Sequence, residues 1–191
     1  MTAAPEGALG QNERVDAEPD RLAALFAELA AGRTEALEGI WELCAGSLHG
    51  LALWRTGSPA DAADAVQEVF VRLAQRRVQL VKVRDHRAYL LAMAHRAAVD
   101  ATRRRRPAVD PEACPFLEAP GEEPERRLDA RRASRLLREL PPAQREAVYL
   151  RCFAGLTFAE AGRVTGVPTF TAASRYRLGI RRLRRSMGVE G

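Results

Sequence analysis

Aromatic residues are scarce in this sequence: they make up 6% of its 191 residues, and Lys82 is the only lysine among 30 basic residues. Apolar residues nevertheless account for 47% of the chain. This share is large enough for a packed core and excludes a chain that is disordered throughout. Strands prefer aromatic and β-branched residues, whereas the residues prominent here, alanine, leucine and arginine, prefer helices. The composition therefore predicts an all-α fold.

Cysteine and histidine are also rare, with three of each. Cys44, Cys114 and Cys152 lie far apart, so they form no CxxC pair and no zinc-ligand spacing with histidine. The histidines lack a neighbouring nucleophile or carboxylate in a catalytic pattern, and there is neither a phosphate-binding loop nor a dinucleotide fingerprint. We therefore expect no metal, no cofactor and no enzymatic activity.

Long apolar runs are missing as well. None approaches the roughly 20 residues that a transmembrane helix requires. The first residues are acidic and have no apolar core, so they are unlike a secretion signal. An odd number of cysteines without such a signal is typical of a reducing compartment. The sequence therefore predicts a soluble, cytoplasmic protein that does not bind membranes.

The net charge of +5 is unevenly distributed along the chain. Residues 1–20 carry five acids and one arginine, and residues 108–129 carry seven acids and two arginines. Residues 130–191 carry thirteen arginines and four acids, a net charge of +9. This segregation indicates different roles for different segments, and a polyanion such as DNA is favoured as partner of the last one.

Helical periodicity and proline content divide the chain into four parts. We expect a disordered tail over 1–19, a helical domain over 20–106, a linker over 107–124 and a second helical domain over 125–191. The linker holds five prolines and many acids, a composition typical of a flexible, extended segment. Within the first domain, residues 76–84 are basic and irregular in pattern, which predicts a loop.

A clear helix start lies at Ser58, a typical N-cap residue, which Pro59 follows at the first helical position. The apolar residues after it repeat at helical spacing and predict a core-facing stripe, namely Ala62, Val66, Val69, Phe70 and Leu73. Asp61, Asp64 and Glu68 lie on the opposite side at intervals of three and four residues. We therefore expect this helix to have one buried face and one acidic, exposed face.

The C-terminal part has the layout of a helix-turn-helix DNA reader. A T-x-x-E capping box at Thr157 opens a short helix that Gly166 ends, and a longer helix follows from Thr169 to about Met187. In the longer helix we expect an inward apolar stripe of Tyr176, Ile180, Leu183 and Met187, with arginines covering the rest. Arginines contact phosphates and the acceptor edge of guanine. The alternative interpretation is an ordinary two-helix corner with a solvated arginine face.

Two blocks of sequence, in this order, resemble the extracytoplasmic-function group of bacterial sigma factors over about residues 20–187. The first block, DAADAVQEVF from Asp61, is similar to the family's D-A-E-D-V-V-Q-E-V-F and is followed by AYLLAMAHRAAVD and a run of arginines. The second block comprises LPPAQRE from Leu140, GLTFAE from Gly155 and GVPTFTAASR from Gly166. The resemblance implies two small helical domains joined by a flexible acidic linker. It also implies a transcription initiation factor that binds core RNA polymerase and directs it to promoter DNA.

The resemblance further implies roles for individual residues. Polymerase docking falls to the acidic helix, at Asp61, Asp64, Gln67 and Glu68. Capture of the minus-ten promoter element falls to Lys82, Arg84, Arg87, Arg96, Arg103 and Arg104. Recognition of the minus-35 element falls to Thr171, Ser174, Arg175, Arg177 and Arg181. An anti-sigma protein is a further implied partner, and the linker either follows the path of RNA in the polymerase or is a plain spacer.

Several positions at the DNA-reading sites depart from the family pattern. Where the family usually has V-P-x-G-T-V-K-S-R, Phe170, Ala172 and Ala173 replace the glycine, valine and lysine. Arg96 stands where an asparagine often contacts the minus-ten base, and Gly162 replaces an alanine, which costs about 1 kcal/mol of helix propensity. The sequence therefore leaves three functions open: a sigma factor of unusual specificity, a sigma-like adaptor that has lost promoter reading, and a stand-alone helix-turn-helix regulator.

Overall fold

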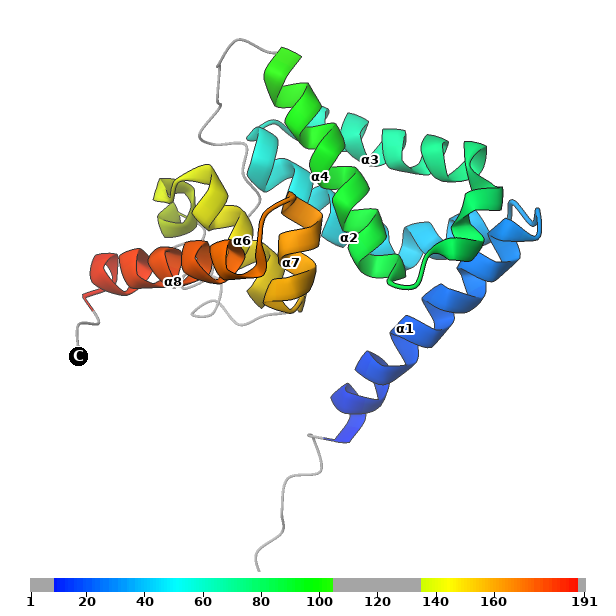
Figure 1. Ribbon diagram of the computed structural model, residues 1–191, viewed down its shortest axis with the longest axis horizontal. Helices are drawn as coiled ribbons and strands as arrows, with labels where there is room; N and C mark the ends of the chain where they lie inside the picture. Colours follow the sequence, from blue (N-terminus) through cyan, green and yellow to red (C-terminus); the bar gives the residue numbers. More distant parts are fainter. Residues whose placement is uncertain (1–8, 105–134, 189–191) are drawn as a thin grey trace, which may run out of the picture.

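The computed structural model describes residues 9–104 and 135–188, with side chains from residue 19 onwards in the first segment (Figure 1). Both segments are helical and contain no strand, which confirms the predicted all-α fold. The helices are α1 (Leu9–Ala30), α2 (Ala36–Thr56), α3 (Pro59–Gln75), the 3-10 helix η1 (Arg77–Lys82), α4 (His86–Arg104), α6 (Pro142–Cys152), α7 (Phe158–Thr165) and α8 (Thr169–Ser186). No helix in these segments is both long and apolar enough to cross a lipid bilayer.

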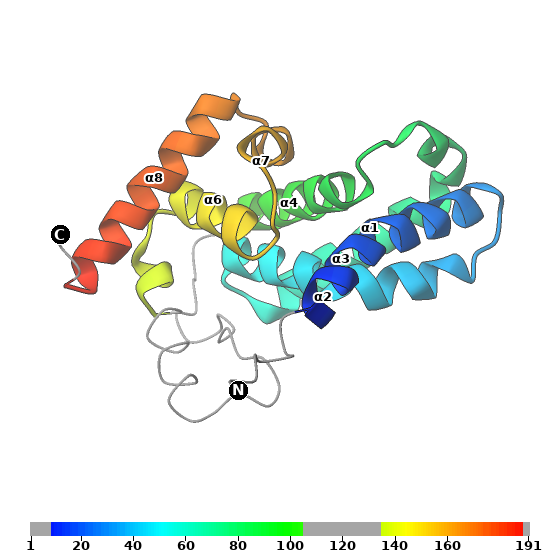
Figure 2. The same ribbon diagram turned by 90° about the horizontal axis from the view of Figure 1, so that it is seen from below.

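The helices form two groups that follow the order of the chain (Figure 2). In the first group α2 is central and packs against α1, α3 and α4, while η1 packs against α1. In the second group α8 packs against both α6 and α7. Gly179 permits the close approach of α8 to α6, because a Cβ there would lie 3.0 Å from the Val148 Cγ2 atom.

Side-chain caps start three of these helices. The Ser58 Oγ accepts a hydrogen bond from the Asp61 N–H at 3.3 Å, as the sequence predicted. The Thr157 Oγ1 accepts from the Glu160 N–H at 3.3 Å, and the Thr157 N–H donates to the Glu160 carboxylate at 2.6 Å, which confirms the capping box. Asp85 caps α4 by accepting from the Ala88 N–H at 3.0 Å. Each cap contributes about 1 kcal/mol to its helix.

The predicted boundaries of the first helix, of one loop and of the linker can be compared with the structure. Helix α1 begins at Leu9 rather than near residue 20 and continues past Pro19, although an interior proline removes one hydrogen-bond donor and crowds the preceding turn. The predicted loop over 76–84 contains η1, which Leu80 anchors with a side chain only 2% exposed. The linker over 107–124 and the predicted start of the second domain at residue 125 lie outside the described residues.

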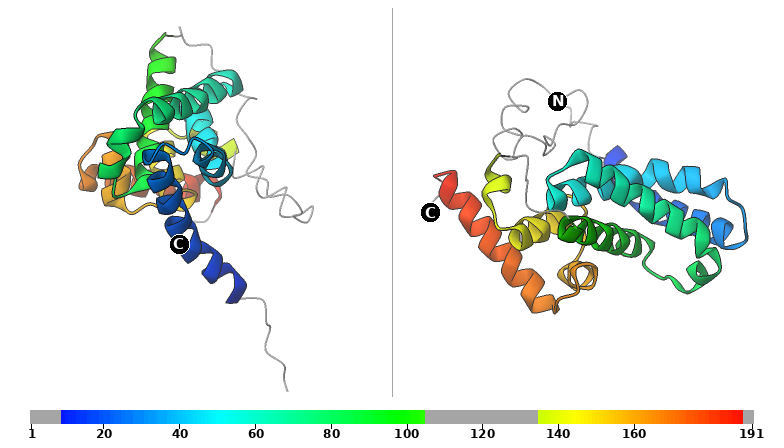
Figure 3. Two further views of the ribbon diagram at one scale, coloured as in Figure 1. Left: turned by 90° about the vertical axis from the view of Figure 1, so that its right-hand side faces the viewer. Right: turned by 90° about the horizontal axis from the view of Figure 1, so that it is seen from above.

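The two groups of helices correspond to the two predicted domains and pack directly against each other (Figure 3). One cluster of buried apolar residues contains members of both groups. Helix α6 packs against α2 as well as α8, and α7 packs against α4. All five residues from Glu146 to Leu150 are buried, so more than one face of α6 is covered. A helix buried on several sides needs more than one neighbour, and here the neighbours come from both groups.

Polar contacts accompany this shared core. The Tyr149 hydroxyl donates to the Ser47 carbonyl oxygen at 3.0 Å, and Gly50 leaves room for it. Glu146 is only 4% exposed, and its Oε1 lies 3.2 Å from the His95 Nε2 and 3.6 Å from the Arg55 Nε. Neither approach has hydrogen-bond geometry, since Glu146 Oε1 and the Arg55 Nε are buried without a hydrogen-bond partner. The contact between α6 and the first group is therefore ionic as well as apolar.

Candidate functional site

The acidic residues of α3 gather on the surface away from the core. Ala62, Val66 and Val69 are buried on the inner face, whereas Asp64 and Gln67 are exposed and Asp61 and Glu68 are partly exposed. Glu68 forms an ion pair with Arg72 one turn further along the helix. The structure thus brings the four residues predicted to dock on polymerase onto one exposed face.

A groove of about 200 Å³ runs beside this acidic face. Asp61, Asp64 and Glu68 line it from α3, and Arg104 lines it from the end of α4. The two alanines of α4 in the groove wall, Ala97 and Ala101, keep its floor apolar. The acidic residues therefore border a concave surface that combines carboxylates, small apolar side chains and one guanidinium group.

The six basic residues predicted for the minus-ten side are all exposed, but the structure splits them into two groups. Lys82, Arg84 and Arg87 lie around the start of α4, and Arg96, Arg103 and Arg104 lie along its later turns. At about 100° per residue, Arg96 and Arg103 share one side of the helix, whereas Arg87 lies on the opposite side from Arg96. A single flat DNA contact cannot include all six residues.

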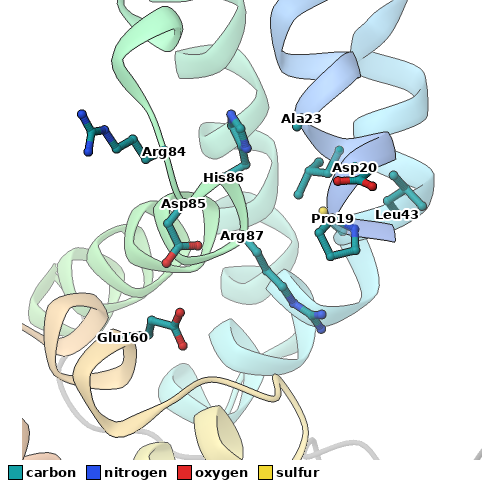
Figure 4. Close-up of a pocket in the computed structure, with 11 residues that line it drawn as sticks. Pro19, Asp20, Ala23, Leu43, Arg84, Asp85, His86, Arg87 and Glu160 are labelled. Atoms are coloured by element: carbon teal, nitrogen blue, oxygen red, sulfur yellow. The ribbon is translucent and has the colours of Figure 1, made fainter. Parts of the chain in front are cut away.

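The first of these groups lies beside a pocket of about 470 Å³ between α1, α2, α4 and α7 (Figure 4). Arg84 and Arg87 line it together with Asp20, Asp85 and Glu160. Close to this pocket, the Arg163 guanidinium of α7 lies 3.1 Å from the Asp85 carboxylate, so α7 is held at the start of α4. Sequence reasoning missed this interdomain pair, because Asp85 and Arg163 lie 78 residues apart and belong to no common motif.

His86 lies in the same pocket wall, with its ring centroid 4.5 Å from that of Phe26. Burial lowers its pKa below the usual value, and the neighbouring Asp85 carboxylate partly opposes this shift. The neutral imidazole is therefore favoured here, which fits a packing role beside the aromatic ring rather than a role as a DNA-binding cation.

The turn between α7 and α8 is set by two glycines. Gly166 has a φ of +71°, a left-handed conformation that favours glycine, and ends α7 as predicted. A Cβ on Gly162 would lie 2.7 Å from the Val167 carbonyl oxygen. The backbone N–H of Val167 donates a hydrogen bond to the Gly162 carbonyl oxygen at 2.9 Å. Gly162 is therefore more than a residue of poor helix propensity: it allows the close turn that positions α8.

Helix α8 presents a distinct outward face. Ala172 and Gly179 are its buried residues, and at about 100° per residue both lie roughly opposite Phe170. Ser174, Arg177 and Arg181 fall within about 40° of Phe170 and share the outward face. Of the five predicted contact residues, Arg177 and Arg181 are exposed on this outward face, and Ser174 lies on it but is half-buried. Thr171 and Arg175 lie at its flanks and are also half-buried.

The predicted apolar stripe of α8 is only partly correct. Tyr176, Ile180 and Leu183 are half-buried and pack against the core, but Met187 is 48% exposed. Helix α8 ends at Ser186, and Met187 is its C-cap residue, one turn beyond Leu183, which still packs against the core. Sequence reasoning also missed Phe170 as a surface residue, although its departure from the family pattern was a signal.

Comparison with protein families gives two matches in the expected order. Residues 40–108 match sigma-70 region 2, and residues 130–183 match sigma-70 region 4. The first match contains the acidic face of α3, and the second contains the outward face of α8 up to Arg181.

Individual proteins give the same picture. An ECF RNA polymerase sigma factor, SigK of Mycolicibacterium vanbaalenii, is 28% identical over 195 residues, which cover 96% of this chain and 96% of that protein. The structure of CnrH in complex with the cytosolic domain of CnrY has a TM-score of 0.65 and 22% identity, and it covers 91% of this chain and 99% of that one. The sigma factor RpoE of Bartonella quintana, in complex with the anti-sigma factor NepR, has a TM-score of 0.64 and 21% identity, and covers 81% of this chain and 98% of that one.

These two structures share the fold of the chain, and the family matches cover both of its charged surfaces. Region 2 is followed by region 4, and SigK, an extracytoplasmic-function (ECF) sigma factor, matches 96% of this chain. The chain therefore belongs to the sigma-70 family of RNA polymerase sigma factors and to its extracytoplasmic-function group.

Proposed function

We propose that this protein is a transcription initiation factor, not an enzyme, that binds core RNA polymerase in the cytoplasm and directs it to promoter DNA. The observation that carries the proposal is the placement of opposite charges on two regions. The acidic face of α3 lies in region 2, and the arginine-bearing outward face of α8 lies in region 4. A polymerase subunit and a DNA duplex are different partners, and each surface suits one of them.

The roles of the residues follow from this division. Asp61, Asp64, Gln67 and Glu68 dock on the polymerase through the groove-bordering face of α3. Arg177 and Arg181 contact DNA phosphates or guanine edges, and Ser174 adds a small hydrogen-bonding group about one turn before Arg177. Thr171 and Arg175, at the flanks of α8, are better placed for the sugar–phosphate backbone than for the base edges.

On the minus-ten side we propose that the two groups of basic residues have separate contacts. Arg96, Arg103 and Arg104 follow one another along α4 and suit the backbone of one strand, because a row of guanidinium groups tracks phosphates. Lys82, Arg84 and Arg87 lie where η1 leads into α4 and suit the neighbouring single-stranded segment. Arg84 and Arg87 line the pocket next to α7, so α7 must move for them to take this role.

Reading two promoter elements requires the regions to separate. Elements centred 10 and 35 base pairs before the start lie roughly 80 Å apart on B-form DNA. In the structure α7 contacts α4 directly, with the Arg163–Asp85 ion pair at 3.1 Å. Residues 105–134 connect the regions, and a chain of that length can reach up to roughly 100 Å when fully extended. We therefore propose that 107–124 serves as a linker between a domain over 20–106 and one over 125–191.

An anti-sigma protein is a further proposed partner. CnrH and RpoE, whose structures resemble this one, were each solved in complex with a second protein, CnrY and NepR respectively. A regulator of this chain would act by holding the two regions together or by covering one of the charged faces.

Reconstitution with core polymerase tests the proposal. The chain should direct promoter-specific transcripts from a genomic template, and absence of any such transcript would reject the function. Asp64→Arg with Glu68→Arg should weaken binding to core polymerase about tenfold or more without unfolding the protein. Asp64 is exposed, and Glu68 is partly exposed and pairs with Arg72 of the same helix. The matched control is Glu38→Arg with Glu42→Arg, the same charge change at the same spacing on α2, where both residues are exposed and Glu42 pairs with Arg21. Equal losses in both double variants would reject the docking assignment.

The remaining alternatives predict different outcomes of the same binding assays. A stand-alone helix-turn-helix regulator would bind duplex DNA tightly without polymerase and would leave the acidic face of α3 without a partner. An adaptor that has lost promoter reading would bind polymerase but give no crosslink to promoter DNA. The arginines on the outward face of α8 favour the initiation factor over the adaptor, since Arg177 and Arg181 are exposed and available to a polyanion.

A further inference from the structure

Phe170 is an aromatic residue that the fold does not use. It is the second residue of α8, and 73% of it is exposed to solvent. Burying a phenylalanine side chain is worth about 1.5–3 kcal/mol, so a fold that leaves one exposed forgoes that stabilisation. The exposed phenylalanine at the start of this helix is therefore available to a partner outside the chain.

The position of Phe170 identifies that partner. In a helix-turn-helix the first residues of the second helix enter the major groove and contact base edges. Phe170 lies at this end of α8, and Ser174, Arg177 and Arg181 continue the same face one turn after another. A cationic stripe directly behind the ring draws in a polyanion, so charge complementarity selects DNA rather than an apolar protein surface.

The chemistry of the ring narrows the contact further. Phenylalanine neither donates nor accepts an ordinary hydrogen bond, so it cannot read the donor and acceptor pattern of the bases. The apolar group that the major groove offers is the 5-methyl group of thymine, and phenylalanine is among the residues that contact it. Because Phe170 replaces the glycine of the family pattern, this contact belongs to the present chain and is not carried over from its relatives.

We propose that Phe170 determines part of the promoter specificity by packing against the 5-methyl group of one thymine in the upstream element. The proposal rests on the function proposed above and adds to it one base and one contact. The turn supports the rigidity that such a contact needs. The Val167 N–H bonds to the Gly162 carbonyl, and a Cβ on Gly162 would lie only 3.5 Å from the Thr169 Cα, so α7 fixes the start of α8.

Replacing thymidine by deoxyuridine tests the contact, because deoxyuridine removes the methyl group and keeps the base pair. Holoenzyme made from the full chain and core polymerase first selects a promoter duplex from genomic fragments. Each thymidine of the upstream element is then replaced in turn. For the wild type we expect affinity to fall about fourfold at one position, which corresponds to roughly 0.8 kcal/mol for one buried methyl group. With Phe170→Ala this difference should vanish at that position, and with Phe170→Leu part of it should remain.

Met187→Ala is the matched control, since it removes another exposed apolar side chain at the far end of α8 and should keep the fourfold difference. Circular dichroism should show the same unfolding temperature for Phe170→Ala and the wild type, because the ring is mostly exposed. If the holoenzyme binds specifically but no position responds to deoxyuridine, or if Phe170→Ala keeps the response, the contact is refuted and the sigma function stands. If the holoenzyme binds no promoter at all, both proposals fall.

Discussion

Substitution of Gly50 by alanine should open the contact between the two regions. A Cβ at this position of α2 would lie 2.3 Å from the Tyr149 hydroxyl oxygen and 3.1 Å from the ring carbon that carries it. Tyr149 is largely buried, so its ring must leave this position, and its hydrogen bond to the Ser47 carbonyl is lost. The lost hydrogen bond accounts for about 0.5–1.5 kcal/mol and the displaced ring for roughly 1–3 kcal/mol.

The same substitution has an opposite effect within region 2 itself. Alanine is more favourable than glycine in a helix interior by roughly 1 kcal/mol, so α2 alone becomes more stable. Gly46→Ala separates the two effects, because a Cβ on Gly46 meets nothing within 4 Å and lies in the same helix. Gly46→Ala should therefore show only the stabilisation, and Gly50→Ala should show the stabilisation together with the loss of the contact between regions.

Small-angle X-ray scattering and thermal unfolding provide the readouts. A loss of about 1.4 kcal/mol shifts the ratio of closed to open molecules tenfold towards the open form, which should raise the radius of gyration of Gly50→Ala but not of Gly46→Ala. The unfolding temperature of Gly46→Ala should rise by roughly 2–4 °C, while Gly50→Ala should unfold in two separate steps. Identical scattering and unfolding for the two variants would refute the contact described between Tyr149 and α2.

Two further predictions concern single side chains. Gly162→Ala should destabilise region 4, although alanine has the better helix propensity, because the new Cβ would lie 2.7 Å from the Val167 carbonyl oxygen. Duplex binding should weaken together with the stability of region 4. An unchanged unfolding temperature of region 4 would contradict this prediction. Burial raises the pKa of Tyr149 to about 12, against the opposing effect of the Arg87 charge. Since the folded state favours the neutral phenol, its contribution to the closed form should be complete below pH 10 and disappear between about pH 10 and 12. Ultraviolet titration of the phenol, with Tyr149→Phe as reference, measures this, and a normal titration near pH 10 would contradict it.

Local features of this fold are readable from the sequence because their interactions span only a few residues. The caps at Ser58 and Thr157 connect atoms three positions apart, and the end of α7 depends on one glycine at Gly166. The acidic face of α3 follows in the same way, since helical spacing alone places Asp64 away from the buried Val66. Motif order then gives the arrangement of region 2 before region 4.

The shared core was not predictable in this way, because periodicity shows which face of a helix is apolar but not what covers it. The buried run from Glu146 to Leu150 lacks the single-face pattern of a surface helix. The side chains that lie against Glu146 are Arg55 and His95, which are distant from it in sequence and carry no motif of their own. The outward position of Phe170 likewise depends on where α6 and α7 meet α8, which only the three-dimensional arrangement reveals.

The burial of α6 on both of its flanks affects how a molecule with separated regions behaves in solution. When region 4 leaves region 2 as proposed, Tyr149 of α6 loses its cover, and so does Trp54 of α2, whose ring centroid lies 6.0 Å from the Arg145 guanidinium of α6. Both side chains then become surface in contact with water. Such surface attracts other copies of the chain, so an opened molecule is prone to self-association until another macromolecule covers it. Under the proposed separation of the regions, the closed form is therefore the one that keeps this apolar surface away from water until polymerase binds the open form.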